Sequence, residues 1–391
     1  MEKALEDIRV IDLGRVIAMP YCTMLLADLG AEVIKVLDPA QADMERRAMK
    51  DTFAGFLMFV NRNKKSITLD LKDPKGVEIF KELVKRADLV VQNFSVGTMD
   101  KLGIGYDALK EVNPKIIYAS VSAFGQDGPD AYQRGYDILA QARSGYVSLT
   151  GPPDGPPMRS GQSISDYYAG MLCAYSIVSA IHYRERTGKG QQIDIALLDS
   201  LVTTLDGAPE LYTIGEEIRP RRGNMYGGYG IFEVQDGYIA LAVTGTDLIW
   251  PRFCRAIGRP ELIKDPKFSE MLTRWNNSDD VQTIVEAWAK TKTRKEALEL
   301  LTQAGVPVAL VNTIDEMVAD PQMQARRMHV EVEHPEYGRV KITGSPLKLS
   351  ETPGKVERAA AIPGEHTEAV LTDILGYTPE EIERLRTAGV I

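Results

Sequence analysis

The stretch from residue 8 to residue 37 reads IRVIDLGRVIAMPYCTMLLADLGAEVIKVL, and it decides the fold. Residues 8–13 form a short, largely apolar run that predicts a strand. Residues 20–30 predict a helix, because a proline stands near the first turn and a glycine at the end. Residues 32–37 predict the next strand. A strand, a helix and a second strand in this order predict a parallel βαβ unit.

The alternation of strands and helices continues beyond this stretch. Residues 73–87 carry apolar side chains at helical spacing and predict an amphipathic helix, whereas residues 88–94 and 115–124 predict further buried strands. We therefore expect an α/β protein with a Rossmann-like large domain. The first strand is followed by DLGRVIAMP, which lacks the GxGxxG motif, and the chain contains no Walker A motif. Neither type of nucleotide site is therefore expected.

Length and composition indicate two domains. The chain has 391 residues, of which 44% are hydrophobic, which is enough for a large core. A basic, glycine-rich stretch at 219–230, RPRRGNMYGGYG, indicates the boundary. We predict a large Rossmann-like domain at 1–200, a linker at 201–224, a smaller α/β domain at 225–325 and a C-terminal segment at 326–391 that returns to the large domain.

Within the second half of the chain, residues 279–304 carry two amphipathic patterns and predict two helices. Pro251 is expected to interrupt the apolar segment 248–258. Near the end of the chain, Thr378 and Glu381 have the spacing of a capping box and predict the start of a helix.

Charge and residue usage exclude several classes of protein. The formal net charge of −9 argues against a nucleic-acid-binding protein, although a local basic pocket can still bind an anionic ligand. Three widely spaced cysteines and four histidines form no metal-binding pattern, so no metal site is expected. No apolar segment is long enough to span a bilayer, and the first residues lack the apolar segment of a signal peptide. We therefore expect a cytoplasmic protein without nucleic-acid or membrane partners.

Asp166 is the most conspicuous candidate for chemistry. It stands in GQSISDYYAGM, between a glycine-rich stretch and a long apolar helix predicted at 166–186. A carboxylate at a helix N-terminus is stabilised in its ionised form. Taken alone, the spacing favours a simple N-cap role. Tyr136 and Asp137, in GYDILAQARSG, form a second polar point, for which packing of the tyrosine in the core is the commoner explanation.

A basic run follows the second predicted strand. Its members are Arg62, Lys64, Lys65, Lys72 and Lys75. This charge is suited to holding phosphates, but a solvated surface is the usual place for such a run.

The stretch before the predicted small domain also allows two interpretations. Arg219, Arg221 and Arg222 are either phosphate ligands or ordinary surface residues. The GGYG sequence at 227–230 is compatible with a mobile lid and equally with a tight turn.

Together, seven segments in order resemble the class III CoA-transferase family, which includes formyl-CoA transferase, carnitine CoA-transferase and the alpha-methylacyl-CoA racemases. The resemblance covers nearly the whole chain. The segments are RVIDLGRVIAMPYCTMLLADLGAEVIKV, NRNKKSITLDLKDPKG, ADLVVQNFSVGTMDKLGIGYDAL, NPKIIYASVSAFGQDGP, GYDILAQARSG, TGPPDGPP with GQSISDYYAG, and RTGKGQQIDIALLDS.

The resemblance implies that Asp166 is the catalytic aspartate and that catalysis is covalent. The carboxylate attacks the thioester of an acyl-CoA and forms a mixed aspartyl anhydride and CoA thiolate. The thiolate then forms an aspartyl-CoA thioester, from which the acceptor acid takes CoA. An aspartate with an ordinary pKa of about 3.9 is ionised at neutral pH, and a dry, positioned site makes it an effective nucleophile. Coenzyme A and its thioesters are substrates here, and no tightly bound cofactor is expected.

The resemblance also implies a CoA site. The residues that match the family's CoA-binding positions are Ala18, Leu69, Lys72, Asn93, Phe94, Lys101 and Arg134. In the family, the position of Ala18 lines the pantetheine path, and those of Leu69 and Lys72 lie beside the adenosine diphosphate. The positions of Asn93 and Phe94 hold the nucleotide. Those of Lys101 and Arg134 offer basic side chains. Gly227 and Gly228 match a flexible loop that shields the acyl-enzyme.

Five further positions bear on the substrate. Ile17 and Asp38 stand where the formyl-CoA branch has a glutamine and an arginine, which argues against formyl-CoA and oxalate. Arg15, Arg46 and Arg47 lie in segments near the family's site and could pair with a second carboxylate. We therefore expect a dicarboxylate such as succinate as donor or acceptor.

Two alternative functions remain. An acyl-CoA racemase needs a base on each side of the α-carbon. The family's racemases carry histidine in a GHD motif, whereas this chain reads GYD, and Tyr136 with an ordinary pKa of about 10 does not replace an imidazole near neutral pH. In that interpretation Glu233 is a candidate proton relay. The other alternative is a non-catalytic CoA-binding protein, against which the motif around Asp166 argues.

The resemblance finally implies an assembly. The family forms homodimers in which two ring-like chains interlock. We expect the same here, with the CoA site between the two domains.

Overall fold

The computed structural model describes residues 2–51, 53–223 and 227–391. The chain forms two compact units, each with its own core. The first contains Met1–Tyr146, Arg159–Thr213 and Pro321–Ile391, and the second contains Val147–Met158 and Ile214–Asp320. The second unit thus takes in residues 147–158, which the predicted boundaries place in the large domain.

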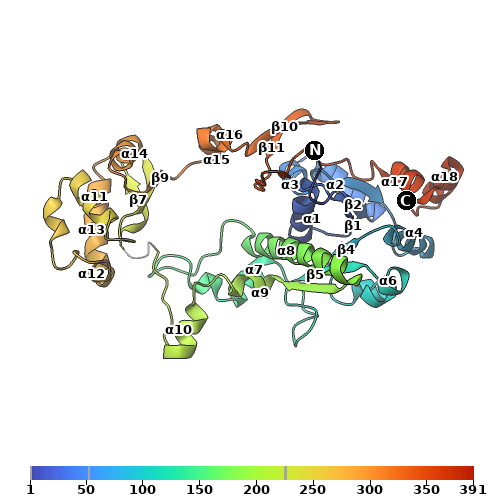
Figure 1. Cartoon of the computed structure of the whole chain (residues 1–391), viewed down its shortest axis with the longest axis horizontal. Helices are drawn as coiled ribbons and strands as arrows, with labels where there is room; N and C mark the ends of the chain where they lie inside the picture. The colour runs from blue at the N-terminus through green and yellow to red at the C-terminus, as the bar shows by residue number, and fades with distance from the viewer. Residues whose placement is uncertain (1, 52, 224–226) are drawn as a thin grey trace. The chain divides into compact units, whose positions relative to one another are not determined.

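A parallel sheet of six strands forms the centre of the first unit (Figure 1). Its strands are β1 (Arg9–Asp12), β2 (Glu32–Leu37), β3 (Lys65–Thr68), β4 (Leu89–Gln92), β5 (Ile117–Ser122) and β6 (Gln192–Ala196). They lie in the order β3-β2-β1-β4-β5-β6, and all neighbouring pairs are parallel. The chain order reverses between β1 and β4, so the carboxyl ends of these two strands form the topological switch point of the sheet.

Helices cover both faces of this sheet, because alternate side chains of each strand point to opposite faces. In β1, Val10 belongs to the core on one face and Ile11 to the core on the other. Helices α1 (Ala18–Asp28) and α8 (Ile164–Thr187) pack on the first face, and α4 (Pro74–Val84) packs on the second. The α/β fold with a parallel sheet is therefore confirmed.

The other helices of the first unit are shorter. They are α2 (Pro39–Ala48), α3 (Ala54–Val60), α5 (Thr98–Lys101), α6 (Tyr106–Val112), α7 (Asp137–Arg143), α9 (Leu197–Val202), α16 (Pro321–Ala325), α17 (Thr367–Leu375) and α18 (Pro379–Thr387). Helix α10 (Ala208–Gly215) crosses the boundary between the units. Helices α2 and α4 both start at the proline of an Asp-Pro pair, where Asp38 accepts the N–H of Ala40 at 2.9 Å and Asp73 accepts that of Lys75 at 2.7 Å.

The second unit is built on a three-stranded antiparallel sheet. Its elements are β7 (Tyr229–Val234), β8 (Gly237–Ala242), β9 (Val308–Leu310), α11 (Ile249–Ala256), α12 (Met271–Asn276), α13 (Ser278–Ala289), α14 (Arg294–Gln303) and α15 (Ile314–Ala319). The aromatic side chains of Trp250, Phe253 and Trp288 are buried in its core. Pro251 does not interrupt the segment as predicted; it lies in the first turn of α11, where a backbone N–H has no partner within the helix.

The C-terminal segment covers the edge of the parallel sheet. After the hairpin β10 (His329–His334) and β11 (Gly338–Thr343), the chain runs along the edge strand β3. The N–H of His366 donates to the carbonyl of Ser66 at 2.8 Å, and the N–H of Thr68 donates to the hydroxyl of Thr367 at 2.9 Å. Farther on, the predicted capping box at the start of α18 is confirmed.

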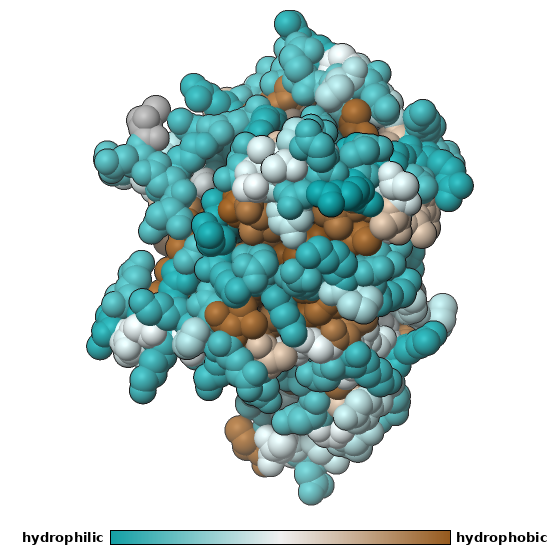
Figure 2. All heavy atoms as spheres, turned by 90° about the vertical axis from the view of Figure 1, so that its right-hand side faces the viewer, coloured by the Kyte–Doolittle hydropathy of each residue, from teal (hydrophilic) through white to brown (hydrophobic). Residues whose placement is uncertain are grey.

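Figure 2 shows one face of the molecule, where hydrophilic residues cover most of the area and hydrophobic residues gather in a few patches. Within the described residues, every helix is either too short or too polar to cross a membrane. In the same part of the chain, His, Cys, Asp and Glu side chains do not gather in threes as a metal site requires.

Candidate active site

A cavity of about 370 Å³ opens at the switch point of the parallel sheet. Its walls come from the segments that follow β1, β4 and β5, and from residues 131–136. Asp166 reaches it from the first turn of α8. Ligands of open α/β sheets bind at this edge, in the crevice outside the carboxyl ends of the strands.

Asp166 is not the N-cap of its helix, contrary to what spacing alone favours. The N-cap of α8 is Ser163, and Asp166 lies three positions farther on. Its side chain is therefore not used to close the helix end. Because it still lies in the first turn, it remains near the free N–H groups of that end.

The pKa of Asp166 is raised to about 7. Burial is the largest cause, because it disfavours the charged form, and the negative charge of Asp137 is the second. A hydrogen bond from the backbone N–H of Ala18 acts in the opposite direction. The expectation of an ordinary, fully ionised carboxylate is therefore wrong. Near neutral pH, Asp166 is therefore more readily protonated than an ordinary aspartate.

Asp137 links α7 to the start of α8. Its Oδ1 accepts hydrogen bonds from the backbone N–H of Ser165 at 2.9 Å and from the Ser165 hydroxyl at 2.7 Å. Its Oδ2 accepts one from the side-chain amide of Gln141 at 2.6 Å. Asp137 thus fixes the helix turn that carries Asp166 and brings a negative charge close to it. Sequence reasoning noted Asp137 in the GYD motif but gave it no such role.

Gly170 is a further site residue that sequence reasoning missed. It lies one helical turn after Asp166, so the two residues share a face of α8. A Cβ atom at position 170 would stand 2.5 Å from the carbonyl oxygen of Ala18. A residue larger than glycine would therefore push the start of α1 away from α8. The Gly four residues after the Asp in SDYYAG was the available signal.

Seven of the predicted site residues line this cavity. They are Arg15, Ala18, Asn93, Phe94, Arg134, Tyr136 and Asp166. The Arg15 guanidinium lies over the Phe94 ring at 4.5 Å. Tyr136 is 70% exposed, so its ring is not packed in the core as residue statistics favour.

The other predicted CoA-binding and substrate-binding residues of the first unit lie outside the cavity. Leu69 is buried in the core, and Lys101 is exposed at the end of α5. The ammonium of Lys72 pairs with Asp38 at 3.2 Å but is mostly exposed. Arg46 donates two hydrogen bonds to the carbonyl of Pro363, at 2.7 and 3.0 Å, so its guanidinium holds the C-terminal segment.

The two glycines of the predicted loop lie in the second unit, at the start of β7, and both are buried. A Cβ atom at Gly227 would stand 2.3 Å from the carbonyl oxygen of Ser278, and one at Gly228 would stand 2.2 Å from a methyl group of Val243. Close packing of this kind is typical of a tight turn. Residues 224–226, before them, lie outside the described residues.

Two residues of the basic run, Arg62 and Lys64, fit neither of the two interpretations, a phosphate site or a solvated face. Arg62 and Lys64 are buried. The Arg62 guanidinium pairs with Asp28 at 2.7 Å, and the Lys64 ammonium pairs with Asp12 at 3.1 Å. Their partners precede them by 34 and 52 residues, which is why a local pattern does not reveal them.

Comparison with known proteins shows the family of the chain. A family model described as CoA-transferase family III matches residues 5–367. The chain is 34% identical to the succinyl-CoA–D-citramalate CoA-transferase of Chloroflexus aurantiacus, over 100% of this chain and 98% of that protein. It is 35% identical to the formyl-CoA:oxalate CoA-transferase of Streptomyces coelicolor, over 100% and 99%. A solved CAIB/BAIF family protein from Brucella suis has a TM-score of 0.84 and 33% identity, over 96% of this chain and 100% of that chain.

Proposed function

The chain belongs to CoA-transferase family III, and from this premise we propose that it transfers coenzyme A from an acyl-CoA to a carboxylic acid through covalent intermediates on Asp166. The observation that carries the proposal is the position of Asp166. Asp166 lines the cavity at the switch point, in the first turn of α8, and one turn later Gly170 of the same helix packs against the start of α1. Residues from three strand ends surround it, which leaves room for a thioester beside the carboxylate.

The first half of the reaction consumes the donor thioester. A carboxylate oxygen of Asp166 attacks the thioester carbonyl carbon, the carbon–sulfur bond breaks, and CoA leaves as a thiolate. The product is a mixed anhydride between Asp166 and the donor acid. The thiolate then attacks the aspartyl carbonyl carbon and releases the donor carboxylate, so Asp166 carries CoA as a thioester. Electrons and atoms balance without net proton transfer.

The second half reverses these steps with the acceptor acid. The acceptor carboxylate attacks the aspartyl thioester, CoA thiolate leaves, and a second mixed anhydride forms. The thiolate attacks the acceptor carbonyl carbon, which gives the new acyl-CoA and regenerates the Asp166 carboxylate. Each step is an acyl transfer between groups of similar energy, so the site needs positioning and oxyanion stabilisation more than driving force.

The raised pKa of Asp166 suits this role. A more basic carboxylate is a stronger nucleophile once it is deprotonated. Its cost is that the protonated form does not attack. We therefore expect kcat/KM to rise with pH up to an apparent pKa of about 7, the value of Asp166.

A dicarboxylate, with succinyl-CoA as the donor, is the substrate class that we propose. Arg15 and Arg134 line the same cavity as Asp166 and supply two cationic groups for a second carboxylate or for phosphates. A relative at 34% identity is named for succinyl-CoA. If Arg15 binds the distal carboxylate, Arg15→Ala raises KM for a dicarboxyl donor about tenfold and leaves that for a monocarboxyl donor of equal length unchanged. Equal effects on both donors would exclude this role.

Racemisation is the second candidate, because a carboxyl pKa near 7 also suits a general base. None of the described residues that line the cavity is a histidine, so the imidazole of the family's racemases has no counterpart among them. Incubation with a 2-methylacyl-CoA in deuterated water distinguishes the two functions. Deuterium at the α-carbon without exchange of CoA between acids would favour racemisation.

We also propose that the chain works as an interlocked homodimer, as in the family. Helix α8 carries Met171, Tyr175 and Val178 on an exposed face, and they are 46%, 74% and 43% exposed. Exposed apolar stripes of this kind are typical of protein interfaces. Mixing of differently labelled chains checks the interlock, because two interlocked rings do not exchange while they remain folded. Rapid exchange would contradict it.

The decisive experiment is a mass-spectrometric assay. The protein is incubated with several acyl-CoAs and a panel of carboxylic acids, and new thioesters are identified. Hydroxylamine is added to trap the acylated side chain. We expect a hydroxamate at Asp166 and a loss of exchange of at least about a thousandfold in Asp166→Asn. Binding of CoA without exchange in every combination would instead favour the non-catalytic alternative.

A further inference from the structure

The turn between β1 and α1 has an unusual backbone. Val16 adopts a φ of 60°, in the left-handed region that β-branched residues avoid. Its side chain is 63% exposed, so packing does not force this conformation. The turn lines the cavity beside Asp166. Strained residues at such places persist only when their surroundings fix them.

One clamp on this turn is the buried carboxylate of Asp12. Its Oδ1 accepts the backbone N–H of Gly14 at 2.7 Å. Its Oδ2 accepts the Thr23 hydroxyl at 2.6 Å and the Lys64 ammonium at 3.1 Å. Lys64 also donates to the carbonyl of Pro20 at 2.9 Å, so the same ammonium holds the end of β1 and the first turns of α1. All these groups are excluded from water.

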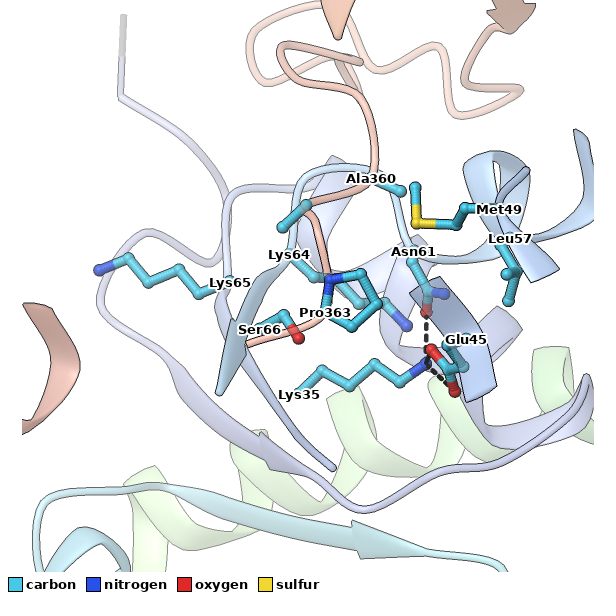
Figure 3. A pocket seen from close by; sticks show the side chains of 11 residues that line it. Lys35, Glu45, Met49, Leu57, Asn61, Lys64, Lys65, Ser66, Ala360 and Pro363 are labelled. Atoms are coloured by element: carbon cyan, nitrogen blue, oxygen red, sulfur yellow. Dashed lines mark hydrogen bonds and ion pairs between the residues drawn. The ribbon is translucent and has the colours of Figure 1, made fainter. Parts of the chain in front are cut away.

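Lys64 does not share the Asp12 carboxylate with Lys35, a second buried lysine of the same pocket, because Lys35 has partners of its own. Figure 3 shows Lys64 and Lys35 side by side, with Lys65 pointing away from them. The Lys35 ammonium is held by Glu45 at 3.1 Å and by Asn61 at 3.2 Å. Two buried cations thus have two separate carboxylates.

A second clamp comes from the end of β4. The side-chain oxygen of Asn93 accepts the N–H of Arg15 at 2.7 Å, and its amide nitrogen donates to the carbonyl of Arg15 at 2.7 Å. Both halves of the Asn93 amide are therefore engaged with the turn. The turn also packs closely at Gly14, where no side chain fits, because a Cβ atom there would stand 2.7 Å from Oδ1 of Asp12.

The turn ends at Ala18, which lines the same cavity as Asp166. Ala18 is the first residue of α1, and its backbone N–H favours the charged form of the Asp166 carboxyl group and so lowers its pKa. Its carbonyl approaches α8 at Gly170. Any movement of the turn therefore moves the hydrogen-bond donor of Asp166.

We propose that Asp12, with its partner Lys64, is a positioning residue for Asp166, because it holds the 14–17 turn so that the Ala18 N–H meets the carboxylate. The reactive role of Asp166 rests on the proposed function, whereas the positioning itself does not. Asp12 touches no substrate in this arrangement. It acts through the backbone, over the length of one turn.

The test compares two buried carboxylates in the same unit. Asp12→Asn and Asp28→Asn each remove a charge that faces a buried cation, and Asp28, which pairs with Arg62, does not contact the turn. The protein is labelled with aspartate carrying ¹³C in the side-chain carboxyl group. The Asp166 signal is identified by its absence in Asp166→Asn and is followed by NMR during a pH titration. This measurement needs no catalysis.

We expect both variants to lower Tm, but only Asp12→Asn to raise the midpoint of the Asp166 titration, by about 0.5 to 1 pH unit, because the N–H that favours the charged form is displaced. We also expect kcat to fall about tenfold in Asp12→Asn with KM for the donor within about twofold. An unchanged midpoint in Asp12→Asn would overturn the proposal and leave the pair a purely structural one.

A milder variant covers the case in which Asp12→Asn does not fold. Thr23→Val removes one hydrogen bond from Asp12 and keeps the shape of the side chain. It should raise the Asp166 midpoint in the same direction by a smaller amount, and Thr23→Ser should restore it. Equal Asp166 midpoints in the wild-type protein, Thr23→Val and Thr23→Ser would reject the proposal. If Asp166→Asn kept its transferase activity, the proposed function would fail, but this comparison of midpoints would still decide the positioning role.

Discussion

Asp12 and Asp166 lie at the same edge of the sheet in opposite surroundings. Asp12 is buried with the Lys64 ammonium at 3.1 Å and two neutral donors. Asp166 has the N–H of Ala18 and faces the negative charge of Asp137, and among the described residues no ion pair to it is found. The first carboxylate is paired with a cation and hydrogen-bonded to two neutral groups, and it joins β1 to α1. The second is destabilised as a charge by burial and by Asp137.

The largest effect should come from breaking a paired site. Asp28→Asn leaves the Arg62 guanidinium buried without its carboxylate. We expect the free energy of unfolding to fall by about 3 to 5 kcal/mol, because an uncompensated buried charge is costly. Urea unfolding measures it. A loss of less than about 1 kcal/mol would mean that water reaches Arg62.

Replacement of Asp166, which has no ion-pair partner among the described residues, should raise the free energy of unfolding instead of lowering it. The pKa of Asp166 in the folded state, about 7, lies above its unfolded value of about 3.8, so the folded protein binds more protons between these two values. Ionisation of Asp166 therefore lowers the stability of the folded protein. This loss of stability is absent below about pH 4 and complete above about pH 7. The free energy of unfolding of Asp166→Asn should exceed that of the wild-type protein by about 2 kcal/mol at pH 8 and equal it at pH 4. Destabilisation at pH 8 would contradict this account.

Asp137→Asn should separate the two causes of the raised pKa. It removes the like charge and keeps an oxygen for the N–H of Ser165. The pKa of Asp166 should then fall by about 0.5 to 1 unit, which corresponds to about 1 kcal/mol. The acid limb of kcat/KM should move to lower pH by the same amount. An unmoved limb would assign the whole shift to burial.

The smallest effect concerns the strained turn. Val16→Gly removes the steric cost of a left-handed β-branched residue but adds freedom to the unfolded chain. The net result should be a gain of about 1 kcal/mol or less in the free energy of unfolding, read by thermal unfolding beside Val16→Ala, which keeps most of the strain. A large loss in Val16→Gly would mean that the valine side chain has a packing role.

The sequence predicts much of the large unit because its strands and helices alternate with clear patterns. Through the resemblance of its motif, the sequence also points to Asp166, which lines the cavity. It does not predict the pKa of Asp166, because the causes are burial and a charge from another helix. It also misplaces Arg62 and Lys64, because their acidic partners come from β1 and α1 and are brought near only by the sheet.

The order of the chain has a consequence for its synthesis. Strand β3 forms one edge of the parallel sheet, and the residue that donates to its Ser66 carbonyl, His366, follows 300 residues later. Between them the ribosome makes the whole second unit. A nascent chain therefore carries a bare strand edge, open to pairing with a neighbouring chain, until its last helices emerge.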